Sequence, residues 1–202
     1  MKKPSSVRTL EDFGRVRLSK SFFMRDFLYS DIAAINGLQN IPDYPDLAIA
    51  AGRKLCDEIL EPLQAAFGRI AIRSAYRSPE VNGLGAKTGM SCASNESNFA
   101  HHIWDRKDAQ GNMGATACVV VPSFYDRFPN EGDWKKLAWW IHDHLPYSQM
   151  CFFKTAYWAF NLSWHERPVR QISSWLEVPR TLTKPGMANH DVSHEEFWRG
   201  II

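Results

Sequence analysis

The stretch Asp46–Ser74, DLAIAAGRKLCDEILEPLQAAFGRIAIRS, decides the fold because it joins the clearest amphipathic helix of the chain to a strand. Apolar residues recur in it every four positions and predict one buried helical stripe, made of Leu47, Ala51, Leu55, Ile59, Leu63 and Phe67. Pro62 lies inside this pattern and predicts a kink or a new turn, and Gly68 is a natural C-terminal stop. Alternating apolar and polar residues then predict a strand over 69–74.

The elements expected on either side of this stretch are shorter. Toward the N-terminus they are a polar arm (1–20), a short helix or turn (22–29) and a loop (37–45). Toward the C-terminus they are a loop (75–89), a strand (115–121), an amphipathic helix (134–145), two strands (149–153 and 157–165) and a last helix with a capping-box pattern from Ser193 to Glu196. This irregular order predicts a single α+β domain over 1–202 with a small, mainly antiparallel sheet flanked by helices, in which 167–202 form a C-terminal extension.

Composition and charge exclude several classes of protein. The 202 residues suffice for a buried core, and the net charge of +2, from 24 basic and 22 acidic residues, lacks the basic excess of a nucleic-acid binder. No apolar run reaches the roughly 20 residues of a membrane span, and MKKPSSVRTL at the N-terminus lacks the apolar segment of a signal peptide. We therefore expect a cytoplasmic protein, or one released from a phage-infected host without a signal peptide. The sequence leaves the oligomeric state open.

Groups able to bind metal or move protons concentrate in Ser97–Pro122, SNFAHHIWDRKDAQGNMGATACVVVP. This stretch predicts a polar loop that runs into an apolar strand, and it is the best candidate for a functional site. The four cysteines of the chain form no CxxC pair and are expected to be free thiols: Cys56, Cys92, Cys118 and Cys151. His142, His144, His190 and His194 lie outside the stretch and are expected at the surface.

Three segments between Phe22 and Asn82 resemble the M15 zinc peptidases, which include D-alanyl-D-alanine carboxypeptidases, D,D-dipeptidases and the L-alanyl-D-glutamate endopeptidases of phage lysis cassettes. MRDFLYSDIAAINGLQNIPD resembles the opening helix and loop of that family, and KLCDEILEPLQAAFG its long helix with the proline of the EPL turn. IAIRSAYRSPEVN resembles its first strand and SGYRS-type loop. The resemblance implies an M15 peptidase-like fold and a peptide or peptidoglycan fragment as ligand.

The resemblance also implies a zinc site, built in that family by S-x-H-x-x-G-x-A-x-D and a later W-x-H pattern with a nearby acidic base. Three protein ligands leave one position for a water whose pKa the metal lowers toward ~7. Here the strand GATACVVVP puts Cys118 at the position of the zinc aspartate and Gly111 at that of the first histidine. FNLSW puts Asn161 at the position of the third ligand, and Phe153 falls near that of the general base.

A rebuilt metal site is one interpretation of these departures. His101 or His102 could supply the first ligand, the Cys118 thiolate could replace the carboxylate, and His165 could supply a third nitrogen. His165 shares a strand face with Asn161 but lies about 13 Å along it. The alternative is that Cys118 is a small buried hydrophobic residue. Zinc and no metal at all are equally consistent with the sequence.

Two further metal and catalytic candidates lie in the loop. His101 and Asp108 have the H-x6-D spacing of the family, although the glycine and alanine between them are absent. His102 and Asp105 could form a pair that acts as a general base, or the two could simply staple the loop.

The loop Ser74–Ser78 supplies the substrate-binding candidates. Arg77 resembles the family arginine beside the substrate, where a guanidinium fork suits a carboxylate or an oxyanion, and it could equally hold a neighbouring loop. Ser74, Tyr76 and, from the later strand, Asn161 complete the predicted substrate site.

These residues support three hypotheses of function. The first is a divergent metallopeptidase-like hydrolase of peptidoglycan-type peptides. The second is an M15-like pseudoenzyme that binds a peptide, a cell-wall fragment or a protein partner without cutting it. The third is new chemistry centred on the loop from His101 to Asp108. Metal content of the purified protein separates the first hypothesis from the second.

Overall fold

The computed structural model describes residues 1–90, 92–154 and 159–202. One sheet runs through the molecule, and its strands are β1 (Ala71–Ser74), β2 (Gly114–Val120), β3 (Gln149–Phe152), β4 (Ala159–His165), β5 (Gln171–Ser174) and β6 (Thr181–Thr183). Their order is β1-β2-β4-β3-β5-β6, and only the β3–β5 pair is parallel. The predicted α+β fold with a mainly antiparallel sheet is confirmed.

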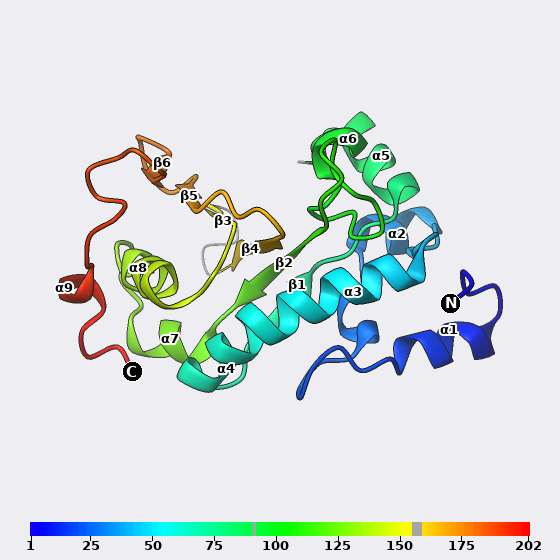
Figure 1. The fold of residues 1–202 in the computed structure, drawn as a ribbon, viewed down its shortest axis with the longest axis horizontal. Coiled ribbons are helices and arrows are strands. Elements are labelled where there is room, and N and C mark those ends of the chain that lie inside the picture. The colour runs from blue at the N-terminus through cyan, green and yellow to red at the C-terminus, as the bar shows by residue number, and fades with distance from the viewer. Residues whose placement is uncertain (91, 155–158) are drawn as a thin grey trace.

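The helices surround this sheet (Figure 1). The described α-helices are α1 (Val7–Gly14), α2 (Asp31–Asn36), α3 (Pro45–Leu55), α4 (Glu61–Phe67), α5 (Pro79–Lys87), α6 (Asn95–Asn98), α7 (Pro122–Arg127), α8 (Trp134–His144) and α9 (Glu195–Trp198). A 3-10 turn, Met24–Phe27, lies in the segment predicted as a short helix or turn. None of the described helices is long and apolar enough to cross a lipid bilayer.

The predicted helix over 46–67 is present as one continuous helix with a widened turn, and we call this unit, from Pro45 to Phe67, the rod. Between α3 and α4 the segment Cys56–Leu60 is a π-helix, in which the Glu61 N–H bonds to the carbonyl of Cys56. Pro62 follows at once and has no N–H to give, so the wider turn accommodates the bond that a proline removes. Gly68, with φ of 80°, ends the rod as predicted.

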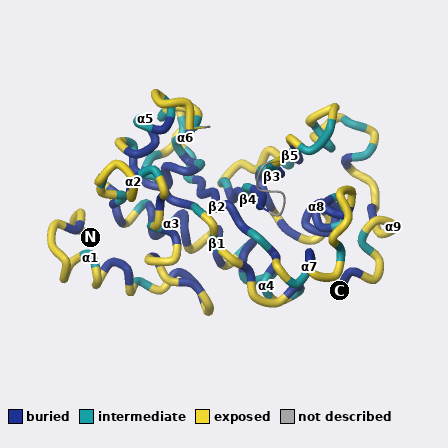
Figure 2. The backbone as a smooth tube through the Cα atoms, turned by 180° about the vertical axis from the view of Figure 1, so that it is seen from behind, coloured by how far each residue is buried: buried dark blue, intermediate teal, exposed yellow. Residues whose placement is uncertain are grey.

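The rod packs against β2 and β4 and buries one face of the sheet. Phe160, Leu162 and Trp164 of β4 point to this side and are at most 6% exposed. Figure 2 shows the buried backbone concentrated in the central strands and in the inward sides of α3 and α8. The opposite face of β4, with Asn161, Ser163 and His165, is the polar face that the alternation predicts.

Several elements differ from the sequence predictions. α1 lies inside the expected arm, and α5 lies in the expected loop at 75–89. Ser78 caps α5 by accepting the N–H of Val81, and Pro79 occupies its first turn, so capping and tertiary contacts outweigh its poor helix propensity. The sequence patterns also do not predict α6, α7, β5 and β6. Residues 157–158 of the strand predicted over 157–165 lie outside the described residues.

Candidate functional site

The polar face of the sheet forms the floor of a cleft. Figure 1 shows α5 and α6 on one side of β2 and β4, and β5 and β6 on the other. Two adjoining hollows share Asn98, His102 and Asn161 along this floor. We call the first, of about 240 Å³, the sheet hollow. The second, of about 490 Å³, is the arginine hollow.

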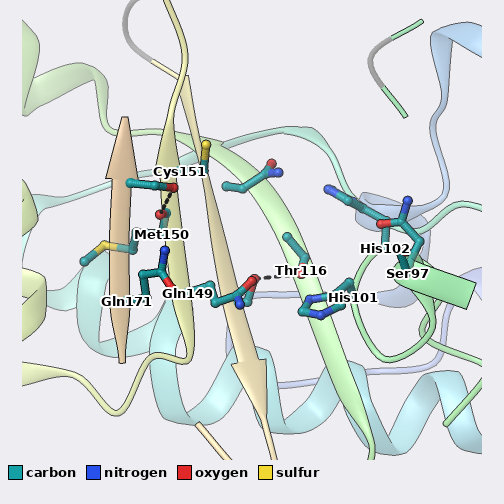
Figure 3. Close-up of a pocket in the computed structure, with 12 residues that line it drawn as sticks. Ser97, His101, His102, Thr116, Gln149, Met150, Cys151 and Gln171 are labelled. Carbon is teal, nitrogen blue, oxygen red and sulfur yellow. Dashed lines mark hydrogen bonds between the residues drawn. The ribbon is translucent and has the colours of Figure 1, made fainter. Parts of the chain in front are cut away.

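The sheet hollow is lined by neutral polar groups (Figure 3). The strands contribute Thr116, Gln149, Met150, Cys151, Asn161, Ser163, Gln171 and Ser173, and the facing loop contributes Ser97, Asn98, His101 and His102. Thr116 and Ser163 share a hydrogen bond of 2.8 Å between their hydroxyl groups. No acidic side chain is among the described residues that line this hollow. It can therefore offer hydrogen bonds to a ligand but no carboxylate base.

The arginine hollow contains two guanidinium groups, Arg73 at the end of β1 and Arg77 in the following loop. Arg77 donates to Cys92 Sγ at 2.6 Å, and its backbone N–H donates to the carbonyl of His102 at 2.8 Å. Burial lowers the pKa of Arg77, and no carboxylate of the described residues forms an ion pair with it. A partly buried cation without an anionic partner is a natural place for an anionic ligand.

His102 lies between the two hollows and is 5% exposed. Its Nδ1 lies 2.8 Å from the carbonyl oxygen of Ala75, and a carbonyl only accepts, so Nδ1 carries the proton. Burial, followed by the nearby charge of Arg77, lowers the pKa of His102 to about 3. The imidazole is therefore neutral at ordinary pH, and its Nε2 is left as an acceptor.

Asp105 takes no part in the cleft. It is 0% exposed and accepts hydrogen bonds from the backbone N–H groups of Asp43 and Tyr44, the hydroxyl of Tyr76 and the guanidinium of Arg106. The catalytic role predicted for Asp105 finds no support in this geometry, because His102 bonds to Ala75 instead and the carboxylate is fully engaged. Tyr76 is likewise buried beneath the cleft.

His101, Asp108 and His165 meet at the other end of the β2–β4 pair. The register pairs Gly114 with His165 and Cys118 with Asn161, so His165 lies four residues along the strand from the arginine hollow. His165 Nε2 lies 3.1 Å from Asp108 Oδ2, and the His101 and His165 rings stack with centroids 6.2 Å apart. Asp108 also accepts bonds from Asn112 and Gln110, which closes its own loop.

The predicted metal ligands therefore divide between two places. Cys118 and His102 line the arginine hollow, whereas His101, Asp108 and His165 gather about four residues away along the strands. Burial raises the pKa of the Cys118 thiol, which keeps it protonated and a poor ligand. All four cysteines are free thiols, as predicted.

A different set of side chains could hold a metal ion. Among the described residues, the group of three or more His, Cys, Asp or Glu whose ligand atoms all lie within 4.8 Å is His142, Asp143 and His194. The surface position predicted for four histidines is correct for His144, which is exposed, and wrong for His142, His190 and His194, which are at most 6% exposed. The C-terminal segment folds back over α8 and covers them, which no local pattern reveals.

Several residues at the cleft were not predicted as site residues. Arg73 lines the arginine hollow with Arg77, Cys92 accepts a bond from Arg77, and Gln149 and Gln171 extend the polar floor onto β3 and β5. The sequence feature that could have revealed the floor is the alternation of half-buried and buried residues, since Gln149 and Cys151 flank the buried Met150. A strand of four residues is too short for this alternation to be recognised without the neighbouring strand.

Comparison with protein-family models, with curated proteins and with solved structures gives no match for this chain.

Proposed function

We propose that this protein binds a peptide-like ligand with a free carboxylate in the cleft over its sheet and does not cleave it. The observation that carries the proposal is Arg77, a partly buried guanidinium that lines the arginine hollow, bonds to Cys92 Sγ and has no carboxylate ion-pair partner among the described residues. Arg73 adds a second positive charge at the same hollow. A carboxylate placed between them would relieve the cost of the buried charge and form charge-assisted hydrogen bonds.

The adjoining sheet hollow supports the same reading for the rest of the ligand. Its Asn161, Gln149 and Gln171 side chains each carry both a donor and an acceptor, which suits the N–H and C=O groups of a peptide. One carboxylate, that of Asp31, also lines the arginine hollow, where it accepts the hydroxyl of Tyr29 at 3.0 Å. The resemblance of residues 22–82 to M15 peptidases favours a peptidoglycan-type peptide as the ligand class.

The chemistry available in the cleft supports binding without cleavage. Cys118 and Asn161 stand where the resemblance expects zinc ligands, and Cys118 is held as a thiol. His102 is a neutral imidazole whose Nδ1 proton is committed to Ala75. Neither hollow brings three metal ligands within reach of one another among the described residues.

Calorimetric titration tests this proposal with an N-acetylated peptide ending in D-alanyl-D-alanine, compared with the same peptide amidated at its C-terminus. We expect the free carboxylate to bind at least about tenfold more tightly, since a charge-assisted bond contributes about 1.5–3 kcal/mol. Arg77→Gln should remove that preference. Arg180→Gln, which changes an arginine stacked on Trp175 outside the cleft, should keep it.

Two results would contradict the proposal. Equal affinity for the acid and the amide would show that Arg77 does not bind a carboxylate. Release of D-alanine by the protein supplied with zinc would instead favour the hydrolase, provided that the release is lost in Cys118→Ser.

A further inference from the structure

A cluster outside the cleft joins the end of α8 to the C-terminal segment. One ligand atom from each of His142, Asp143 and His194 lies within 4.8 Å of the others. His142 and His194 are 4% and 3% exposed, so their rings are held in place by packing. Two ligands of a zinc ion at about 2.0–2.2 Å are roughly 3–4 Å apart, so the spacing of the cluster suits such an ion.

The hydrogen bonds of the two histidines fix which ring nitrogen of each could bind an ion. His142 Nε2 lies 2.8 Å from the carbonyl oxygen of His190, and His194 Nε2 lies 2.8 Å from that of Asn189. Because a carbonyl only accepts, each Nε2 carries a proton, and each Nδ1 is the nitrogen that can face an ion. Nδ1 of His194 lies 2.8 Å from Asp143 Oδ1, and Nδ1 of His142 lies 2.7 Å from the Tyr147 hydroxyl, which an ion would displace. Metal-binding histidines are oriented in this way, with the second ring N–H given to a backbone carbonyl.

Hydrogen bonds and ring stacking fix the positions of the Asp143 carboxylate and the His194 ring. Asp143 Oδ2 accepts the backbone N–H of His194 at 3.0 Å and Trp198 Nε1 at 2.8 Å, which leaves Oδ1 facing His194 Nδ1 at 2.8 Å. The His194 ring stacks on Trp139 with centroids 3.7 Å apart and an angle of 5°. The side chain of Asp143 is 15% exposed and offers a path for an ion from solvent.

We propose that His142, Asp143 and His194 bind a divalent transition-metal ion, and that this ion fastens the C-terminal segment to α8. Imidazole nitrogen with one carboxylate oxygen suits zinc. The ion comes between His194 Nδ1 and Asp143 Oδ1, and any proton that these two atoms share passes to solvent. The site lies outside the cleft, where an ion would stabilise the fold, and it does not depend on the ligand proposed for the cleft.

Zinc itself is the probe for this site. Full-length protein is treated with a chelator, freed of it by dialysis and titrated with zinc against a chromophoric competitor, while Tm is followed in parallel. We expect one zinc per chain, and a rise in Tm of about 5 °C at a hundredfold excess over Kd. Cobalt in place of zinc should give visible bands without a thiolate charge-transfer band, because no cysteine belongs to the cluster.

Matched variants locate the site. Asp143→Asn and His194→Gln should abolish both the stoichiometric zinc and the zinc-dependent rise in Tm. His144→Gln, on the same helix but bonded to the carbonyl of Trp140, should keep both. The rise in Tm is measured within each variant, so a lower starting stability does not obscure it.

The proposal is overturned if the wild type takes up no zinc at micromolar concentration. It is also overturned if Asp143→Asn and His194→Gln retain one zinc per chain while His102→Asn or Cys118→Ser lose it, since the metal would then lie in the cleft.

Discussion

At the scale of single residues, Gly114 decides how closely the candidate-site loop approaches the sheet. A Cβ at this position would lie 2.0 Å from the carbonyl oxygen of Ala100 and 2.8 Å from the His165 ring. The Ala100 oxygen belongs to the backbone, so it cannot move aside as a flexible side chain could. Only glycine at position 114 therefore lets the loop 98–112 close over the start of β2.

We therefore expect Gly114→Ala to lower the free energy of unfolding by about 3 kcal/mol, as overpacking against a rigid neighbour does. Urea denaturation monitored by tryptophan fluorescence measures this loss. Gly132→Ala is the control, because its Cβ would meet no atom within 4 Å, and it should change stability little. Similar stabilities for the two variants would mean that the loop is not held against β2.

His102 makes the stability of the fold depend on pH. Its folded pKa is lowered to about 3, whereas the unfolded chain has the ordinary value of 6.5, so acid adds a proton to the unfolded state first. The stability from the neutral ring is thus complete above pH 6.5 and falls below it by about 1.4 kcal/mol per pH unit. His102→Asn, which can keep a donor for Ala75, should flatten this fall between pH 6 and about 4 in urea denaturation. An unchanged slope would show that another group causes it.

At the scale of elements, Asp105 connects the loop before α3 to the candidate-site loop. It accepts the N–H groups of Asp43 and Tyr44 next to the start of α3, and its pair with Arg106 is buried on the aspartate side. A buried carboxylate with four donors stabilises an arrangement that no single segment could hold alone.

Asp105→Asn should destabilise the protein by about 3 kcal/mol, because the buried donors lose a charged acceptor. Asp108→Asn, in which the side chain is 19% exposed and keeps an amide oxygen for Asn112, should lower stability by about 1 kcal/mol or less. Thermal denaturation of the pair measures the contrast. A larger loss at Asp108 than at Asp105 would refute it.

Much of the fold was open to prediction from local pattern. The buried stripe from Ala51 to Phe67, the stop at Gly68 and the two faces of β4 all follow from periodicity and turn chemistry, whereas Leu47, predicted as part of the stripe, is only half-buried. α5 was missed because its stability rests on contacts outside the helix, such as the bonds from Asn82 of α5 to Ala93 and Asn95. The position of Arg77 in a hollow, and the burial of His142 and His194, likewise depend on segments that meet only in the folded chain.

At the scale of the whole molecule, the two ends of the chain lie at opposite ends of the structure (Figure 1), and the C-terminal segment closes one of them. Ile201 is 2% exposed, and its carbonyl accepts Arg127 of α7 at 3.0 Å. His194 stacks on Trp139 of α8 in the same region. The cleft lies away from these contacts, on the polar face of the sheet.

Deletion of residues 193–202 should therefore separate stability from ligand binding. We expect a loss of about 3 kcal/mol in the free energy of unfolding, since burial of Ile201 alone contributes about 2 kcal/mol. The preference for a free carboxylate should remain, because Arg77 is untouched. Urea denaturation and calorimetric titration of the same preparation measure the two effects, and loss of binding in a folded truncated chain would contradict this separation.

The strand order has a consequence for folding during synthesis on the ribosome. β2 pairs with β1 on one edge and with β4 on the other. The first residue of β4 that pairs with β2 is Ala159, which is synthesised 39 residues after Val120. Until then the growing chain carries an apolar strand with an open edge, a form prone to pair with neighbours. The floor of the cleft is thus complete only late in synthesis, so a nascent chain could bind the proposed ligand only after β3 and β4 have emerged.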